Sequence, residues 1–256
     1  MSTITFGNYY QNVVKDKDVK KQVLKLIKKD IAKDPDKNWY DLELDGKSYR
    51  YKKYDSPVDL TAKVAGKTYN IGDFCLFEKS PIEWNVVKDD GDTITLVSTK
   101  LLYSMEFALD EYDKYAESLV REFLNVRFLN ESFSDEEKAK LIKQNIMKER
   151  SLHSGFEHRK DVAKSIDDYV YILSKKEARS EDYGMKLKAN RKFAVTEYAS
   201  FNGGGKAGKN GNWWTRTTVK GVTNDFAHIV TNKGSIDKAD TFIYGVCLLP
   251  CIVIKK

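Results

Sequence analysis

The most unusual stretch of the sequence reads Asn212-Trp213-Trp214-Thr215-Arg216-Thr217-Thr218. It places two of the chain's four tryptophans side by side, followed after one residue by an arginine and two threonines. Tryptophan and threonine favour strands, and neighbouring side chains of a strand point to opposite faces. We therefore expect one of Trp213 and Trp214 to anchor a core while the other lines a surface or a second layer.

The segment before this stretch, residues 202–211, contains five glycines. Such a composition predicts a flexible loop that does not pack by itself. A polar loop beside a rigid aromatic strand is typical of a recognition surface, so we expect binding through residues 202–244. The expected contact residues are exposed aromatic, amide and charged side chains of this region: Asn202, Asn210, Asn212, Trp213, Trp214, Arg216, Asn224, Asp225 and Tyr244.

The composition describes a globular protein of 256 residues, either one large domain or a domain with an appended segment. The formal net charge is +6, from 44 basic and 38 acidic residues, and the lysine-rich runs are interleaved with Asp and Glu. This pattern favours solvated faces over a nucleic-acid footprint. We expect no nucleic-acid partner.

The first residues have no basic or apolar region of a secretory signal peptide, and no apolar run is long enough for a membrane span. We expect no membrane insertion, and a location in the cytoplasm or in an assembly exported without a signal peptide. The three cysteines, Cys75, Cys247 and Cys251, lie in apolar strand-like contexts, which predicts buried free thiols.

The periodicity of apolar residues predicts an α+β fold with strands at both ends and helices between. The expected strands cover residues 4–11, 38–54 as a hairpin turning at 45–46, 69–78, 82–87, 93–98, 168–173, 212–218, 227–231 and 246–254. The expected helices cover 18–34, 118–129, 134–148, 175–179 and 191–199. Residues 56–66 are expected to form a linker.

Nine motifs in this order resemble those of a large bacterial and phage domain family without assigned function. The first resembles its I-x-F-G-x-Y-x-Q opening and the fourth its S-x-x-R-x-W-L-N pattern. The motifs are Ile4–Gln11, Pro81–Val86, Leu96–Ser98, Ser118–Asn125, Phe133–Glu137, Val170–Ser174, Arg191–Ala199, Trp213–Thr217 and Tyr244–Pro250. The chain departs from the family's G-V-R-P-A pattern, because no arginine follows Val246.

The resemblance implies a C-type-lectin-like fold with a mixed or antiparallel sheet, two main helices and a long irregular loop region. Its relatives would include the variable proteins of diversity-generating retroelements and the formylglycine-generating enzymes. Residues 1–11 would give the first strand, 12–66 a helix-hairpin extension and 67–256 the lectin-like domain. The implied function is recognition of a protein or glycan, with no cofactor.

Two alternatives stay open. One is an enzyme related to the formylglycine generators, which would need Cys247 or Cys251 to be exposed and reactive. The other is a structural part of a phage or secreted assembly, in which residues 12–66 mediate oligomerisation. Residues 203–210 lack the pattern of a phosphate-binding loop, and His153, His158 and His228 lack zinc-site spacing. We expect no metal, and enzymatic activity has no positive support.

Overall fold

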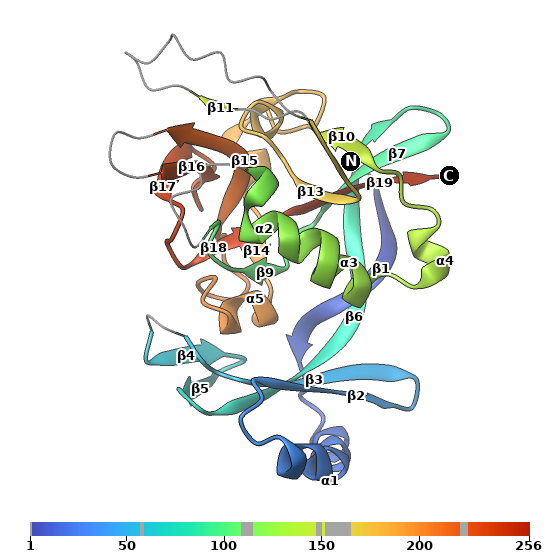
Figure 1. Ribbon diagram of the computed structural model, residues 1–256, viewed down its shortest axis with the longest axis vertical. Coiled ribbons are helices and arrows are strands. Elements are labelled where there is room, and N and C mark those ends of the chain that lie inside the picture. The colour runs from blue at the N-terminus through green and yellow to red at the C-terminus, as the bar shows by residue number, and fades with distance from the viewer. Residues whose placement is uncertain (1, 57–58, 109–114, 147–149, 152–164, 221–224) are drawn as a thin grey trace.

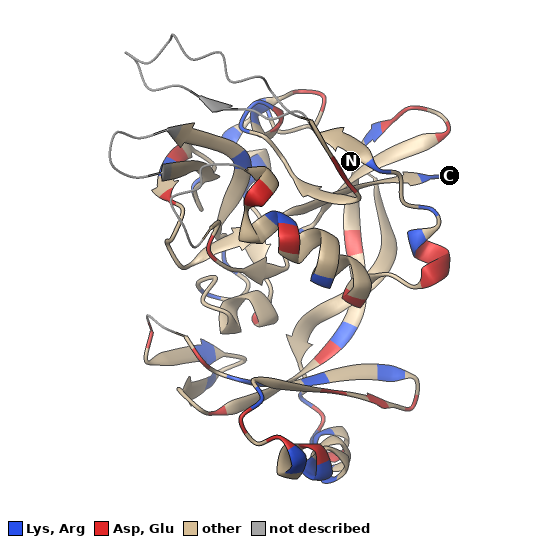
Figure 2. Cartoon of the chain, in the orientation of Figure 1, with Lys and Arg blue, Asp and Glu red and all other residues tan. Residues whose placement is uncertain are grey.

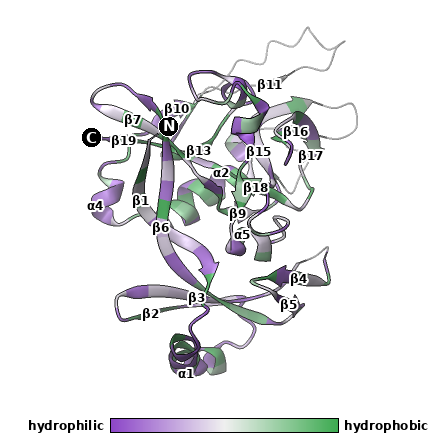
Figure 3. Cartoon of the chain, turned by 180° about the vertical axis from the view of Figure 1, so that it is seen from behind, coloured by the Kyte–Doolittle hydropathy of each residue, from purple (hydrophilic) through white to green (hydrophobic). Residues whose placement is uncertain are grey.

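A computed structural model describes residues 2–56, 59–108, 115–146, 150–151, 165–220 and 225–256. The chain forms a strand-rich α+β structure with two large sheets (Figure 1). Hydrophobic residues are concentrated in the main body, whereas much of the part formed by residues 14–73 is hydrophilic (Figure 3). We call residues 14–73 the N-terminal module.

The larger sheet joins the two ends of the chain. Its order is β13-β19-β7-β6-β3-β2, with β1 paired to β6. The strands are β1 (Thr3–Val13), β2 (Trp39–Leu44), β3 (Lys47–Lys53), β6 (Phe74–Asp89), β7 (Thr93–Ser98), β13 (Val170–Ile172) and β19 (Pro250–Lys255). The first and last strands of the chain therefore belong to one sheet.

The long strand β6 links the module to the body. Its first residues pair with β3, its middle with β1 and its last residues with β7. The prediction of two separate strands over 69–78 and 82–87 was wrong, because one strand runs from Phe74 to Asp89 through Pro81. Pro81 lies opposite Asn8 at a register shift of β1, so the strand passes through it.

The second sheet surrounds the double-tryptophan strand. Its order is β17-β16-β15-β18-β9, with β11 beside β15. The strands are β9 (Tyr103–Ser104), β11 (Arg150–Ser151), β15 (Asn212–Lys220), β16 (Asp225–Val230), β17 (Ile236–Asp240) and β18 (Val246–Leu248). Because β15 is central and covered on both faces, Trp213 and Trp214 are each 0% exposed. Neither tryptophan lines a surface. The second of the two expected alternatives, a second buried layer, is the one that the structure shows.

Short pairs complete the strands: β4 (Thr61–Val64) with β5 (Lys67–Asn70), β8 (Lys100–Leu101) with β14 (Ala194–Val195), and β10 (Gln144–Ile146) with β12 (Ile166–Asp168). The β4–β5 hairpin lies in the segment predicted as a linker. It turns at Ala65 and Gly66, both with positive φ, and buries Ala62 and Val64. The linker prediction was wrong because the glycine closes a turn between paired strands.

The helices are α1 (Lys17–Lys33), α2 (Leu119–Glu122), a π-helical segment (Phe123–Phe128), α3 (Leu129–Ser132), α4 (Asp135–Lys138) and α5 (Glu197–Phe201). Short 3-10 turns lie at Tyr115–Glu117, Glu177–Arg179 and Lys188–Arg191. The helix predicted over 134–148 has its capping box but ends at Lys138. Leu141 then bridges Ile254, and β10 follows; residues 147–149 lie outside the described residues.

The N-terminal module has its own small core. The Asp16 carboxylate caps α1 by accepting from the backbone of Asp18 and Val19. Val23 packs with Val14, Tyr49 and Leu76 against the β2–β3 hairpin. The outer side of α1 carries lysines with a few acids (Figure 2). The predicted helix and hairpin are confirmed.

Arg50 fixes the module to the body. Its side chain is 1% exposed and forms ion pairs with Asp41 of the same hairpin and with Glu131 of α3. It also donates to the Tyr198 hydroxyl and lies 4.2 Å from the centroid of the Tyr10 ring. Each partner beyond Asp41 belongs to the main body, so one buried cation joins the two parts.

The recognised motifs contact one another in the interior. Trp84 Nε1 donates to Phe6 O at 2.7 Å, and Gly7 N donates to Glu137 Oε1 at 2.9 Å. Asn125 bonds the backbone of β13, with Nδ2 donating to Val170 O at 2.8 Å. These contacts give the motif residues structural roles.

Candidate functional site

The glycine-rich segment 202–211 is ordered by hydrogen bonds. Gly204 N donates to Ala199 O, Gly208 N to Val195 O, and Gly211 N to Phe193 O, at 2.9, 2.8 and 3.1 Å. A Cβ on Gly204 would lie 2.6 Å from Cys247 Sγ. The prediction of a loop that cannot pack was wrong, because glycine here permits close approach to the body.

Several expected contact residues hold the fold together. Trp213 Nε1 donates to Arg191 O and Trp214 Nε1 to Met105 O, at 3.0 and 2.9 Å, inside the protein. Arg216 is 6% exposed, donates to Ile172 O, and pairs with Glu177. These three side chains are not surface contacts, because their polar atoms serve the interior.

The remaining expected residues are dispersed. Asn212 Oδ1 accepts from Asn232 N at 2.8 Å, and exposed Asn210 bridges Ala194. Asn224 and the side chain of Asp225 lie outside the described residues. Of the set, the structure brings together Asn202 and Tyr244.

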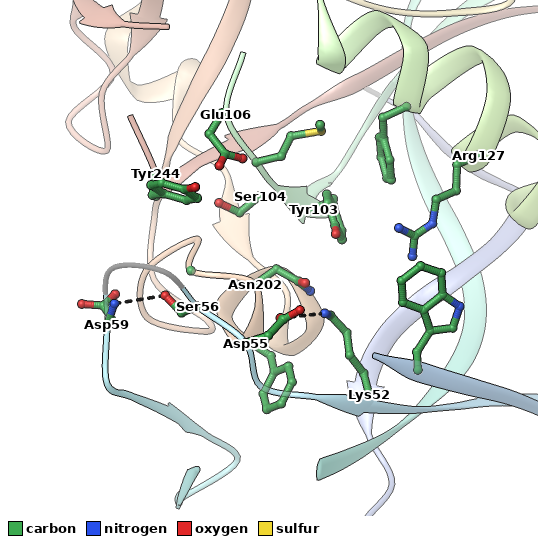
Figure 4. A pocket seen from close by; sticks show the side chains of 16 residues that line it. Lys52, Asp55, Ser56, Asp59, Tyr103, Ser104, Glu106, Arg127, Asn202 and Tyr244 are labelled. Atoms are coloured by element: carbon green, nitrogen blue, oxygen red, sulfur yellow. Dashed lines mark hydrogen bonds and ion pairs between the residues drawn. The ribbon is translucent and has the colours of Figure 1, made fainter. Parts of the chain in front are cut away.

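Asn202 and Tyr244 line a cleft of about 370 Å³ between the N-terminal module and the main body (Figure 4). The module supplies Trp39 of β2, Lys52 of β3, and the following loop. The body supplies β9, the π-helical segment, the end of α5 and the β17–β18 loop. The lining residues are Trp39, Lys52, Asp55, Ser56, Asp59, Tyr103, Ser104, Met105, Glu106, Phe123, Arg127, Phe201, Asn202, Gly203, Tyr244 and Gly245.

Arg127 marks a cationic end of the cleft. It projects from the π-helical segment, a distortion that is frequent at functional sites. Its Nε donates to Glu131 Oε1 at 2.9 Å, and its guanidinium lies 4.3 Å from the centroid of the Trp39 ring. Nη2 is buried without a hydrogen-bond partner among the described residues. Burial opposes its charge, but Tyr103, Tyr9 and Glu131 raise the pKa of Arg127 overall.

Lys52 adds a second positive charge. Its side chain is 7% exposed, and Nζ lies 3.2 Å from Asp55 Oδ1. Burial lowers the pKa of Lys52, and the Asp55 carboxylate opposes that effect. Lys52 pairs with Trp39 across the β2–β3 hairpin, so both side chains lie at its open end.

The opposite end of the cleft carries acceptors. Figure 4 shows Glu106, Tyr244 and Asp59 there, away from Arg127. A hydrogen bond with Glu106 raises the pKa of Tyr244. Asn202 Nδ2 donates to Tyr198 O at 2.7 Å, which orients the amide and leaves Oδ1 as an acceptor.

An aromatic pair stands between these ends. Tyr103 stacks on Phe123 with ring centroids 4.5 Å apart and an interplanar angle of 17°. Burial raises the pKa of Tyr103, so its hydroxyl stays neutral. The cleft therefore combines flat apolar faces with a few fixed polar groups, which is typical of a small-ligand site.

The cysteines do not serve the cleft. Cys247 and Cys251 are each 0% exposed, and burial raises the pKa of Cys247 to about 12 and that of Cys251 still further. The strand predicted over 246–254 is broken at Leu249, so Cys247 belongs to β18 and Cys251 to β19, in different sheets. The exposure required for a formylglycine-generating mechanism is not met. Cys75 is also buried and free, so all three thiols fit the prediction.

Over the described ranges, no group of three or more His, Cys, Asp or Glu could hold a metal ion. His228 is buried, with Nε2 3.3 Å from Lys175 Nζ and Nδ1 3.2 Å from Asp237 O. His153 and His158 lie outside the described residues. Within the part of the chain that is described, no helix has the length and apolarity to cross a membrane.

Five residues that line the cleft were not among the predicted contact residues: Trp39, Lys52, Tyr103, Glu106 and Arg127. One signal was present, because a hairpin turning at residues 45–46 pairs Trp39 with Lys52. Nothing in the sequence placed that pair beside the helix that carries Arg127. The cleft arises from contact between segments far apart in the chain.

No curated protein matches the chain, and no solved structure matches it. A family described as "Domain of unknown function (DUF6273)" matches residues 92–256, more than half of the chain. That range contains the body wall of the cleft, whereas the module wall precedes it. The motif resemblance is thus supported at the level of a domain family without assigned function, and the chain belongs to the DUF6273 family.

Proposed function

We propose that the protein is a ligand-binding module that recognises a glycan in the cleft between module and body. The observation that carries this proposal is that the aromatic side chains of Trp39 and Tyr103 and the hydroxyl-binding groups of Glu106 and Asn202 line one cleft. The C–H faces of sugar rings stack on aromatic rings, and their hydroxyls donate to carboxylate and amide oxygens.

The size of the cleft supports a small ligand. Its volume of about 370 Å³ is at the lower end of ordinary small-molecule sites. Asn202 and Tyr244 are the first and last residues of the predicted binding region 202–244, and both line the cleft. The buried strand within that region, which carries Trp213 and Trp214, supports the cleft and does not contact the ligand.

A glycan array followed by titration calorimetry tests the proposal. Tyr244→Ala removes a ring that is 41% exposed and lines the cleft. Phe242→Ala is the matched control, because Phe242 is 37% exposed in the same loop but does not line the cleft. We expect about tenfold weaker binding for Tyr244→Ala and little change for the control. Glycan binding that neither substitution alters would overturn the assignment to this cleft.

A protein ligand is the second candidate. Phe242, Ile243 and Tyr244 are 37%, 46% and 41% exposed at the edge of the cleft, and such a run of apolar side chains is typical of a contact surface. A protein that covers the whole loop would lose affinity with Phe242→Ala as well as with Tyr244→Ala. A pull-down compared across the two variants therefore separates the candidates.

A C-type-lectin-like fold for residues 67–256, with residues 1–11 as its first strand, belongs to the same proposal, with the diversified bacterial and phage receptors as relatives. It is supported by the sheet in which β1 and β19 flank β6 and β7. Superposition of an experimental structure on C-type-lectin domains is the test, and the lack of a common core over these four strands would refute it.

A further inference from the structure

We propose that the ligand of the cleft is a saccharide that carries a carboxylate, and that Arg127 and Lys52 bind this group. The inference rests on the proposed glycan function and adds its chemical class. It follows from the uneven distribution of charge along the cleft and from the incomplete pairing of one guanidinium.

The carboxylates near the cationic end are already engaged. Both oxygens of Glu131 accept from Arg50, and both oxygens of Asp41 do the same. Within the described part of the chain, Arg127 has one hydrogen bond, from Nε to the Glu131 oxygen that Arg50 also uses. Fewer carboxylate bonds therefore compensate the charge of Arg127 than that of Arg50.

The orientation of Arg127 suits a planar anion. Glu131 holds one edge of the guanidinium, and the Trp39 ring lies against its face at 4.3 Å. The terminal Nη2 is buried without an acceptor among the described residues. Fixed guanidinium groups bind carboxylates through two parallel hydrogen bonds. A ligand carboxylate beside Trp39 would supply an acceptor to the part of the Arg127 guanidinium that lines the cleft.

Lys52 provides the second contact. Its Nζ is held by Asp55 at the same side of the cleft as Arg127 (Figure 4). An ammonium group has three donors, and among the described residues Asp55 engages one of them, which leaves others for a ligand. A carboxylate between Arg127 and Lys52 would meet two cations.

The other end of the cleft favours neutral hydroxyls. Glu106 and Asp59 repel a second negative charge but accept hydrogen bonds from hydroxyl groups. The aromatic pair of Tyr103 and Phe123 lies between the two ends. A ligand with one carboxylate and a hydroxyl-bearing ring satisfies all three regions, as in a sugar acid. An acidic peptide satisfies the cationic end alone.

Matched sugars test the inference by titration calorimetry. The monosaccharides galacturonate and galactose differ only at C6, where the acid carries a carboxylate in place of a hydroxymethyl group, and we expect the acid to bind at least about tenfold more tightly. Arg127→Gln should remove most of this preference, measured as the ratio of the affinities for the two sugars. Arg127→Lys should keep part of it, because the charge stays but the paired donors are lost. Lys140→Gln is the charge-matched control, since Lys140 is exposed outside the cleft.

The outcomes separate the two proposals. Equal affinity for both sugars overturns the carboxylate inference and leaves glycan binding in place. No binding of either sugar, with no other glycan bound on an array, overturns both. Binding of an acidic peptide in place of the acidic sugar, with the same dependence on Arg127, overturns the saccharide part. Thermal unfolding of each variant shows that the compared proteins are folded.

Discussion

Replacing Arg50 by methionine tests how the cleft is held together. The Arg50 side chain is 1% exposed and carries five hydrogen bonds, to Asp41, Glu131 and Tyr198. Methionine keeps much of the buried volume but removes every donor. The hairpin that carries Trp39 and Lys52 would then lose its charged link to the body.

The expected loss follows from the groups left behind. Removing one partner of a buried ion pair costs about 3–5 kcal/mol, because the other charge stays buried. Here Asp41 is 46% exposed and Glu131 keeps its bond to Arg127, so both remaining carboxylates are partly compensated. We therefore expect the lower limit, about 3 kcal/mol. For a chain of this size that corresponds to a decrease in Tm of roughly 6–12 °C.

Urea unfolding followed by tryptophan fluorescence measures this loss. Lys47→Met is the matched control on the same hairpin, because the Lys47–Glu78 pair has a similar distance, 2.8 Å, but is solvent-exposed. Such pairs contribute little, so the control should change the free energy of unfolding little. If Arg50→Met is no less stable than Lys47→Met, then Arg50 does not hold the module on the body. Ligand binding should weaken in Arg50→Met and persist in the control.

Three further predictions concern the interior. Cys247 and Cys251 should resist thiol labelling in the native protein and react in denaturant, because both are buried with raised pKa values; rapid native labelling would contradict this. Gly204→Ala should lower stability by about 1–3 kcal/mol, since its Cβ would lie 2.6 Å from Cys247 Sγ; an unchanged urea midpoint would show that the contact relaxes freely. Burial, with Lys175 nearby, lowers the pKa of His228 below its usual 6.5. As the pH falls below about 6.5, His228 takes up a proton in the unfolded chain before it does so in the folded protein. The free energy of unfolding therefore decreases until the pH reaches the pKa of His228 in the folded state. His228→Gln should reduce this pH dependence between about pH 7.5 and pH 5, and an unaltered dependence would argue against it.

The elements that the sequence predicted well are those set by local signals. The helix of α1 follows from its apolar spacing and its Asp16 cap, and the β2–β3 hairpin follows from alternation around an Asp-Gly turn. Arg121 and Asn125, four residues apart on one helical edge, bond to β12 and β13. In each case the decisive residues lie within a few positions of one another.

The errors arose where distant contacts decide. Glycines in residues 202–211 indicated flexibility, but Gly204 and Gly211 are needed because Cys247 and Val195 leave no room for a Cβ. Regular spacing along the predicted helix 118–129 would put Val126 on the core face with Phe123, yet Val126 is 58% exposed. The π-helical segment shifts the register of the faces after Phe123, so regular spacing placed Val126 wrongly.

The candidate site was least predictable because its two walls meet only in the folded chain. The body wall lies within the range that matches the family, and the module wall lies outside it. Glu131 bonds both Arg50 of the module and Arg127 of the cleft, so docking of the module and positioning of the binding guanidinium share one carboxylate. A ligand that binds Arg127 should therefore stabilise the docked module, because it binds the assembled cleft alone. The same linkage requires Arg50→Met to lower affinity and stability together. Loss of stability without loss of affinity would mean that the module is not part of the binding site.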